Sequence, residues 1–183
     1  SNIASFKQNK RFAKLNLMKA YFASEEYQKA LEASNNVLDL DDLENPIKWD
    51  ALTIKARSSL LLKDTVGASD IYFILEKSPD ELVVAEALYF RANLLHIDGK
   101  YDLSNDLISQ ISISTNQSSI WNAKSLLLLA KNYYLMNDPF QAIFVLDSLI
   151  KNFETYDQIV SEAELLKTKF EDLLKNKNQK YNG

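Results

Sequence analysis

The sequence predicts an all-α protein that consists of four helical hairpins followed by a single C-terminal helix. Two observations predict this fold class. Apolar residues recur along most of the chain at the i, i+3, i+4 and i+7 spacing of one helix face. Small residues also align between successive segments at nearly constant intervals. In addition, three Gly and three Pro in 183 residues are too few for a fold rich in β-turns.

The hairpins occupy residues 11–155, and each joins two helices through a short polar turn. Residues 1–10 are a lead-in whose Ser1-Asn2 matches the scar of a cleaved expression tag, so we expect a fragment from the C-terminal part of a larger protein. Residues 156–176 hold a capping helix, and residues 177–183 form a polar tail. The expected helices are 12–22 and 27–40, 49–62 and 64–75, 82–97 and 101–111, 121–136 and 139–150, and 158–174.

The first two hairpins are separated by an acidic segment. Ser24-Glu25-Glu26 turns the chain inside the first hairpin, and residues 39–45 with Pro46 are expected to form a loop. The second hairpin turns at Asp64 and ends before Pro79. The apolar faces of these helices contain Leu15, Met18, Phe22, Ala30, Leu31, Val37, Leu52, Ala56, Ala68, Ile71 and Leu75.

The last two hairpins carry clearer turn signals. Asp98-Gly99-Lys100 separates the helices of the third. In the fourth, Asp138 is a good N-cap, and Pro139 fits the first helical turn because it needs no N–H there. The final helix places Ala163, Leu166 and Phe170 on one face and charged residues on the other. That pattern is typical of a terminal element that covers the last unit of a stacked array.

Small residues define a register between the hairpins. The second helices align at Ala30, Ala68, Ser104 and Ala142, which follow one another at nearly equal intervals along the chain. The first helices align at Met18, Ala56, Ala92 and Ala130, and the interval from each of these to its partner on the second helix is the same in all four hairpins. Side chains of this size let two helices approach closely, so we expect these residues at the helix crossings.

This pattern resembles the tetratricopeptide repeat, a helix–turn–helix unit of about 34 residues with small residues at both crossing positions. Tyr21, Tyr133, Tyr27 and Tyr101 stand where that family favours an aromatic residue. The resemblance implies a right-handed α–α superhelix. The repeats here are longer than usual, and Met18, Ser104, Ser59 and Leu95 depart from the usual residue types. Such extended repeats resemble bacterial cell-envelope proteins, including outer-membrane barrel-assembly lipoproteins, which favours the envelope over the cytoplasm.

The sequence shows few residues suited to catalysis or metal binding. It has no Cys, its single His is His96, and its three Gly are isolated. The acidic run of residues 39–44 lacks the spacing of a calcium loop. A net charge of −4 argues against a nucleic-acid surface, and no apolar run approaches the roughly 20 residues that span a bilayer. We therefore expect no enzyme activity, cofactor, metal, nucleic acid or membrane span.

The resemblance implies a binding groove, because the family's first helices line the concave face. The residue after each small position points into that groove. The implied groove residues are Lys19, Arg57, Asn93 and Lys131, with Tyr89, His96 and Tyr134 beside them. A row of cations and amides with aromatic edges suits an extended, acidic or carboxylate-bearing peptide. The Lys that the family's carboxylate clamp has four residues before the groove Asn is replaced here by Tyr89.

Three functions remain open at this point. The groove residues predict a scaffold or adaptor that binds a peptide or a partner subunit, although they could also be solvated positions on long helices. The repeats could instead serve homo-oligomerisation. A third possibility is a non-catalytic appendage of an enzyme. The apolar face around Phe6, Phe12 and Leu15 further predicts weak self-association through residues 6–22.

Overall fold

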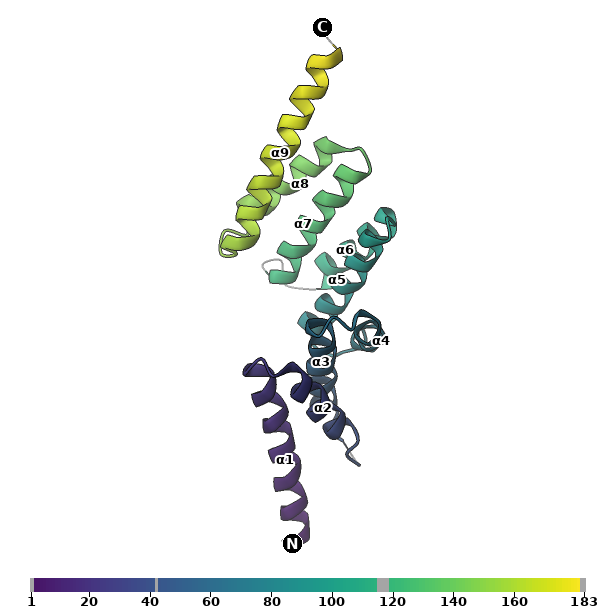
Figure 1. Cartoon of the computed structure of the whole chain (residues 1–183), viewed down its shortest axis with the longest axis vertical. Coiled ribbons are helices and arrows are strands. Elements are labelled where there is room, and N and C mark those ends of the chain that lie inside the picture. The colour runs from purple at the N-terminus through teal and green to yellow at the C-terminus, as the bar shows by residue number, and fades with distance from the viewer. Residues whose placement is uncertain (1, 42, 115–118, 182–183) are drawn as a thin grey trace. The chain divides into compact units, whose positions relative to one another are not determined.

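The computed structural model describes the backbone of residues 2–41, 43–114 and 119–181 and the side chains of residues 8–41, 43–111 and 119–176. Every regular element in this part of the chain is a helix, so the all-α prediction is confirmed (Figure 1). The helices are α1 (Asn2–Ala23), α2 (Tyr27–Leu38), α3 (Asn45–Leu61), α4 (Thr65–Leu75), α5 (Glu81–Ile97), α6 (Tyr101–Ser114), α7 (Ile120–Leu135), α8 (Pro139–Asn152) and α9 (Asp157–Tyr181).

Three helix ends differ from the prediction by four residues or more. Helix α1 begins at Asn2 and not near residue 12, so most of the lead-in is helical. Helix α3 begins at Asn45, and Pro46 lies in its first turn instead of in a loop, where its missing N–H costs nothing. Helix α9 continues to Tyr181 through most of the expected polar tail. The Lys and Gln residues of that segment favour helix without any need for burial.

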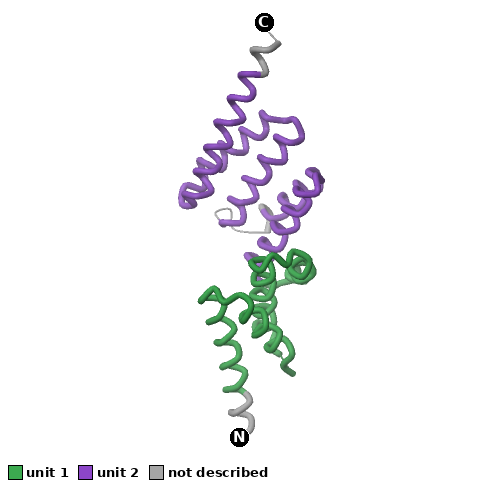
Figure 2. Tube along the Cα trace, viewed as in Figure 1, with its two compact units in different colours: residues 1–79 green, residues 80–183 purple. Residues whose placement is uncertain are grey.

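The chain divides into two compact units, residues 1–79 and residues 80–183 (Figure 2). The first unit holds α1 to α4, with α2 packed against both α1 and α3 and with α3 packed against α4. The second unit holds α5 to α9, in which each helix packs against the next and α7 also contacts α5 and α9. Within each unit, this neighbour-to-neighbour packing is consistent with a helical repeat.

The eight aligned residues, which are small except for Met18, are all buried. All eight of them, from Met18 to Ala142, have no solvent-exposed surface. At the third hairpin the crossing also carries a hydrogen bond, in which Ser104 Oγ donates to the backbone oxygen of Ala92 at 2.8 Å. The predicted crossing residues are therefore confirmed as buried. Ser104 replaces alanine there without leaving its hydroxyl unsatisfied.

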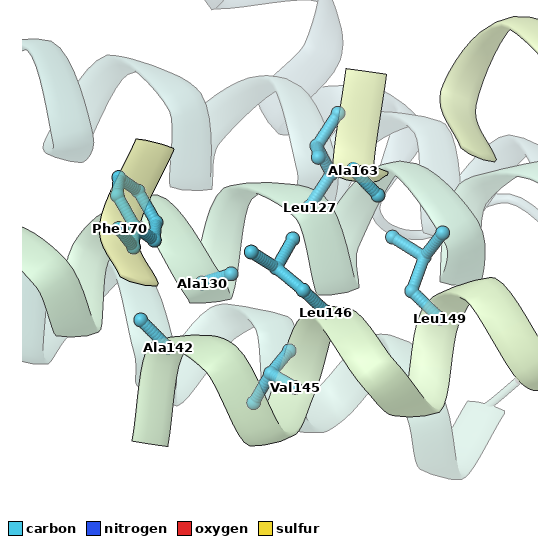
Figure 3. Close-up of a cluster of buried hydrophobic side chains, with 8 residues drawn as sticks. All are labelled: Leu127, Ala130, Ala142, Val145, Leu146, Leu149, Ala163 and Phe170. Atoms are coloured by element: carbon cyan, nitrogen blue, oxygen red, sulfur yellow. The ribbon is translucent and has the colours of Figure 1, made fainter. Parts of the chain in front are cut away.

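The core of the second unit closes with α9. Ala163 and Phe170 of α9 are buried in a cluster with residues of α7 and α8, and Leu166 packs against the same cluster. Figure 3 shows Phe170 and Ala163 beside Ala130 and Leu127 of α7, with Leu146 and Leu149 of α8 completing the cluster. Two of the three residues predicted to cover the last hairpin are thus buried in its core, and the third, Leu166, packs against that core.

Four turns between helices share one backbone conformation. Glu25, Lys63, Gly99 and Asn137 have φ values of 61°, 65°, 74° and 64°, in the left-handed region. The N–H of each following residue donates to the carbonyl five positions earlier, for example from Asp138 to Tyr133 at 2.9 Å. This is the Schellman arrangement of a helix C-terminus. Its spacing along the chain repeats that of the buried small residues.

Two of these left-handed residues have side chains that disfavour the conformation. We expect Lys63→Gly and Glu25→Gly each to raise the free energy of unfolding by about 0.5–1 kcal/mol, because relief of the left-handed strain exceeds the entropy cost of glycine. Gly99→Ala should lower it by about 1 kcal/mol, and this cost is purely backbone, since a Cβ at Gly99 would contact nothing within 4 Å.

Urea unfolding of each variant measures these changes. Ser24→Gly, one residue before Glu25 and without a positive φ, is the matched control and should not stabilise the protein. A Lys63→Gly variant no more stable than wild type would contradict the expected strain.

Candidate functional site

The predicted groove residues are distributed over both units, and the four that follow the crossing positions lie on four different helices. Lys19 and Arg57 lie on α1 and α3 of the first unit, and Asn93 and Lys131 lie on α5 and α7 of the second. Lys19 Nζ is 2.5 Å from the carboxylate of Asp50 on α3, with about half of each side chain exposed. Arg57 is half-buried. In the first unit, Lys19 therefore joins the first helices of two successive hairpins.

Lys131 makes the equivalent contact in the second unit. Its Nζ is 2.8 Å from Glu162 Oε1 on α9, and the two side chains are 34% and 51% exposed. Asp50 and Glu162 follow their lysines at the same interval in the sequence. Both predicted groove lysines are thus paired with carboxylates, and the equal interval indicates that α1–α3 and α7–α9 share one packing register.

The remaining polar member, Asn93, is half-buried on α5. The residue that follows it at the same interval is Lys124 on α7, whose ammonium lies 4.4 Å from the centre of the Trp121 ring. Asn93 therefore differs from Lys19 and Lys131, because the residue at this interval after it is a lysine and not a carboxylate. A cation over an indole face is stabilised by the ring quadrupole.

The two predicted groove tyrosines are half-buried and contact other rings. Tyr134 stacks on Phe170 of α9 with 3.9 Å between ring centres and 4° between ring planes. The ring centre of Tyr89 lies 5.6 Å from the ring centre of Trp121. Burial, and then the nearby Glu162 carboxylate, raise the pKa of the Tyr89 hydroxyl above 10.0, because both disfavour the phenolate. Lys131 and Tyr134 therefore both contact residues of α9.

His96 belongs to a buried polar network centred on Asn132. His96 Nδ1 is 2.5 Å from Asn132 Oδ1, and Asn132 Nδ2 donates to Ser104 Oγ at 2.9 Å and to Asn105 Oδ1 at 2.7 Å. Since both amide hydrogens are used, Asn132 Oδ1 is the atom that accepts from His96, and Nδ1 of the imidazole carries the hydrogen. The centre of the His96 ring also lies 5.8 Å from the centre of the Tyr101 ring.

Sequence reasoning missed Asn132, which has no exposed surface. The available signal was Ser104, a polar residue at a crossing position where the other second helices have alanine. A hydroxyl at a close crossing needs hydrogen-bond partners. Its partners here are a carbonyl of α5 and the amide of Asn132 on α7. The network therefore joins α5, α6 and α7.

The described part of the chain contains no group of three or more His, Cys, Asp or Glu side chains placed to hold a metal ion. In the same residues, no helix is both long and apolar enough to span a bilayer. Asp42, within the acidic run, lies outside the described residues. Comparison with protein-family models and with curated proteins finds no match to this chain.

Proposed function

We propose that this chain is a tetratricopeptide-like interaction module in which α1 to α8 form four helix pairs of a right-handed superhelix capped by α9. Three repeated features support this arrangement. The left-handed turns recur with the same spacing as the buried small residues. The second helices begin at equivalent positions after those turns. The two lysine–carboxylate pairs have the same separation in the sequence.

The proposed function is to bind an extended peptide or a partner subunit along the first helices, without catalysis. The observation that carries this proposal is the accessibility of Lys19 and Lys131, which keep 50% and 34% of their side chains exposed although each has a carboxylate partner. Exposed ion pairs contribute only about 0–1 kcal/mol. A peptide carboxylate can therefore replace Asp50 or Glu162 at small cost, with Asn93 and the edges of Tyr89 and Tyr134 adding polar and apolar contact.

A displayed library of random C-terminal peptides, selected on the wild-type protein, tests this proposal. We expect the selected peptides to be acidic, and Arg57→Glu or Lys131→Glu to weaken their binding by about 1–3 kcal/mol, because each change removes a charge-assisted hydrogen bond. The loss should decrease with added salt. Fluorescence anisotropy measures the affinities, and thermal melts show whether each variant remains folded.

Lys151→Glu on α8 is the matched control, since it reverses an exposed lysine away from the first helices. It should leave peptide affinity unchanged. If the control weakens binding as much as Arg57→Glu, the peptide is responding to net charge and the first helices are not the site.

Homo-oligomerisation is a second candidate, favoured by the exposed apolar residues of α1. Phe12 is 65% exposed and Leu17 is 49% exposed on that helix. Exposed apolar surface of this kind promotes association when it is contiguous. Sedimentation of wild type and of Phe12→Ser tests this function, because self-association through α1 should be weaker in the variant. The third hypothesis, an appendage of an enzyme, is tested by the full-length reading frame.

A further inference from the structure

Helices α1 and α3 are joined by two contacts one turn apart. Leu15 and Ile47 pack against the same apolar cluster. One turn further along both helices, Lys19 meets the carboxylate of Asp50. Helices α7 and α9 repeat both features at the same intervals in the sequence, with Leu127 and Ile159 in one cluster and with Lys131 paired to Glu162. The chain therefore packs these helices in one repeated register.

Helices α5 and α7 pack in the same register but without the carboxylate. Tyr89 and Trp121 stand at the positions of the apolar pair, and their ring centres are 5.6 Å apart. One turn further along, the two polar positions hold Asn93 and Lys124, and both side chains are half-buried. The register therefore brings a neutral amide and a cation together where the other helix pairs have a lysine and an acid.

Lys124 is a cation without an acidic partner. Its Nζ lies 4.4 Å from the centre of the Trp121 ring, and no acidic side chain in the described part of the chain pairs with it. The ring attracts the charge but occupies none of the three N–H donors as a carboxylate oxygen would, so these donors remain available to a ligand. Glu162 does not fill this role, because Lys131 holds its carboxylate at 2.8 Å.

We infer that Asn93 and Lys124 form a subsite for a carboxylate of the bound peptide, which occupies the position that Asp50 and Glu162 have in the other two helix pairs. A carboxylate there accepts from the ammonium and from the amide together. The inference rests on the proposed peptide function and assigns the anchoring group of its ligand, which is either the C-terminal carboxylate or an Asp or Glu side chain. Lys124 binds this group without giving up an acidic partner, in contrast to the lysines of the other two pairs.

Three synthetic peptides test the inference on the full chain. All share one Ala/Ser sequence that ends in Leu. The first has a free C-terminal carboxylate, the second is amidated, and the third is amidated and has Glu before the Leu. We expect the first or the third to bind at least about tenfold more tightly than the second by fluorescence anisotropy, because only these two supply a charge-assisted hydrogen bond. The one that does so identifies the source of the carboxylate.

A second measurement reports on the subsite itself. Trp49→Phe leaves Trp121 as the single tryptophan of the sequence. Binding of the unlabelled carboxylate peptide to this variant should change the indole emission, because the carboxylate draws the Lys124 ammonium away from the ring. The amidated peptide without Glu should leave the emission unchanged.

Two variants of the subsite should remove the preference for a carboxylate. Lys124→Met keeps an unbranched side chain but removes the charge, and it should weaken binding of the carboxylate peptide at least about tenfold. Asn93→Lys/Lys124→Glu installs the lysine–acid pair of the other positions, so it should abolish the preference while urea unfolding stays cooperative. Lys151→Met on α8 is the matched control, since it makes the same change at an exposed lysine, and it should leave binding unchanged.

Equal affinity for the three peptides, or no binding of any of them, would overturn the inference. A folded Lys124→Met variant that binds like wild type would do the same. These outcomes are separate from those of the proposed function, which is tested with library-selected peptides at Arg57 and Lys131. If Lys131→Glu weakens the selected peptides and Lys124→Met does not, the proposed function stands and the subsite is wrong. If only Lys124→Met weakens binding, the subsite stands and the wider first-helix site is wrong.

Discussion

Replacing Phe170 with alanine is expected to lower the free energy of unfolding by about 3–5 kcal/mol, the usual cost of removing a buried aromatic side chain. Phe170 is 3% exposed and stacks on Tyr134 of α7. It also packs with Ala130 and Leu146, so the substitution leaves a cavity bordered by three helices (Figure 3). Urea unfolding followed by circular dichroism measures the change.

Leu165→Ala is the matched control for this prediction. Leu165 lies on the same helix but is 73% exposed, so its replacement should change stability by less than about 0.5 kcal/mol. Deletion of residues 157–183 should have a larger effect than Phe170→Ala, with aggregation, because it uncovers the cluster that α9 buries. Phe144 does not contribute to that effect, since it is already exposed with α9 in place. A truncated protein that melts like wild type and stays monomeric would show that α9 does not close the fold.

Asn132→Ala is expected to cost about 2–4 kcal/mol, because it removes the partner of His96 Nδ1 and of two acceptors, Ser104 Oγ and Asn105 Oδ1. Each buried polar group left without a partner costs about 1–3 kcal/mol, although half-buried His96 can recover part of this from water. The loss of side-chain volume at a site with no exposed surface adds a cavity term.

Two further variants decide whether the network or the volume causes the loss. Asn132→Leu keeps the branched shape and fills the space of the amide but restores none of the hydrogen bonds, so it should remain at least about 1 kcal/mol less stable than wild type. Asn16→Ala, at an exposed position of α1, is the surface control and should stay within about 0.5 kcal/mol. An Asn132→Leu protein as stable as wild type would mean that the polar network does not stabilise this packing. Chemical unfolding at several urea concentrations gives all three values.

The helices and their crossings could be predicted from local sequence patterns. Apolar spacing of 3.6 residues is a local property, so it located the helices correctly to within a few residues at most ends. The small residues at Ala68 and Ala142 identified where helices meet, because a close approach of two backbones excludes larger side chains. Asp64 and Asp138 cap their helices through their own side chains, which accept from Gly67 N and Gln141 N. These interactions join near neighbours in the chain and can be read without a fold.

The left-handed turns were only partly visible in the sequence. Gly99 and Asn137 are residue types that tolerate a positive φ, but Glu25 and Lys63 are not. Those two adopt the conformation because the packing of the helices on either side, together with the hydrogen bonds of the helix end, requires it. Pro46 was expected in a loop but lies in the first turn of α3. Proline is compatible with both positions, so the residue alone does not decide between them.

The partners of the candidate-site residues depend on how the helices pack. Lys131 and Lys19 looked like free cations of a groove, yet each meets a carboxylate on a helix further along the chain. Asn132 likewise bonds to residues of two earlier helices, Asn105 and Ser104 on α6 and His96 on α5. Periodicity shows which face of a helix a side chain occupies. It does not show which residue of the neighbouring helix lies opposite, because that depends on the shift and angle between the two helices. Whether a polar residue on that face is solvated, paired or buried is therefore settled by packing.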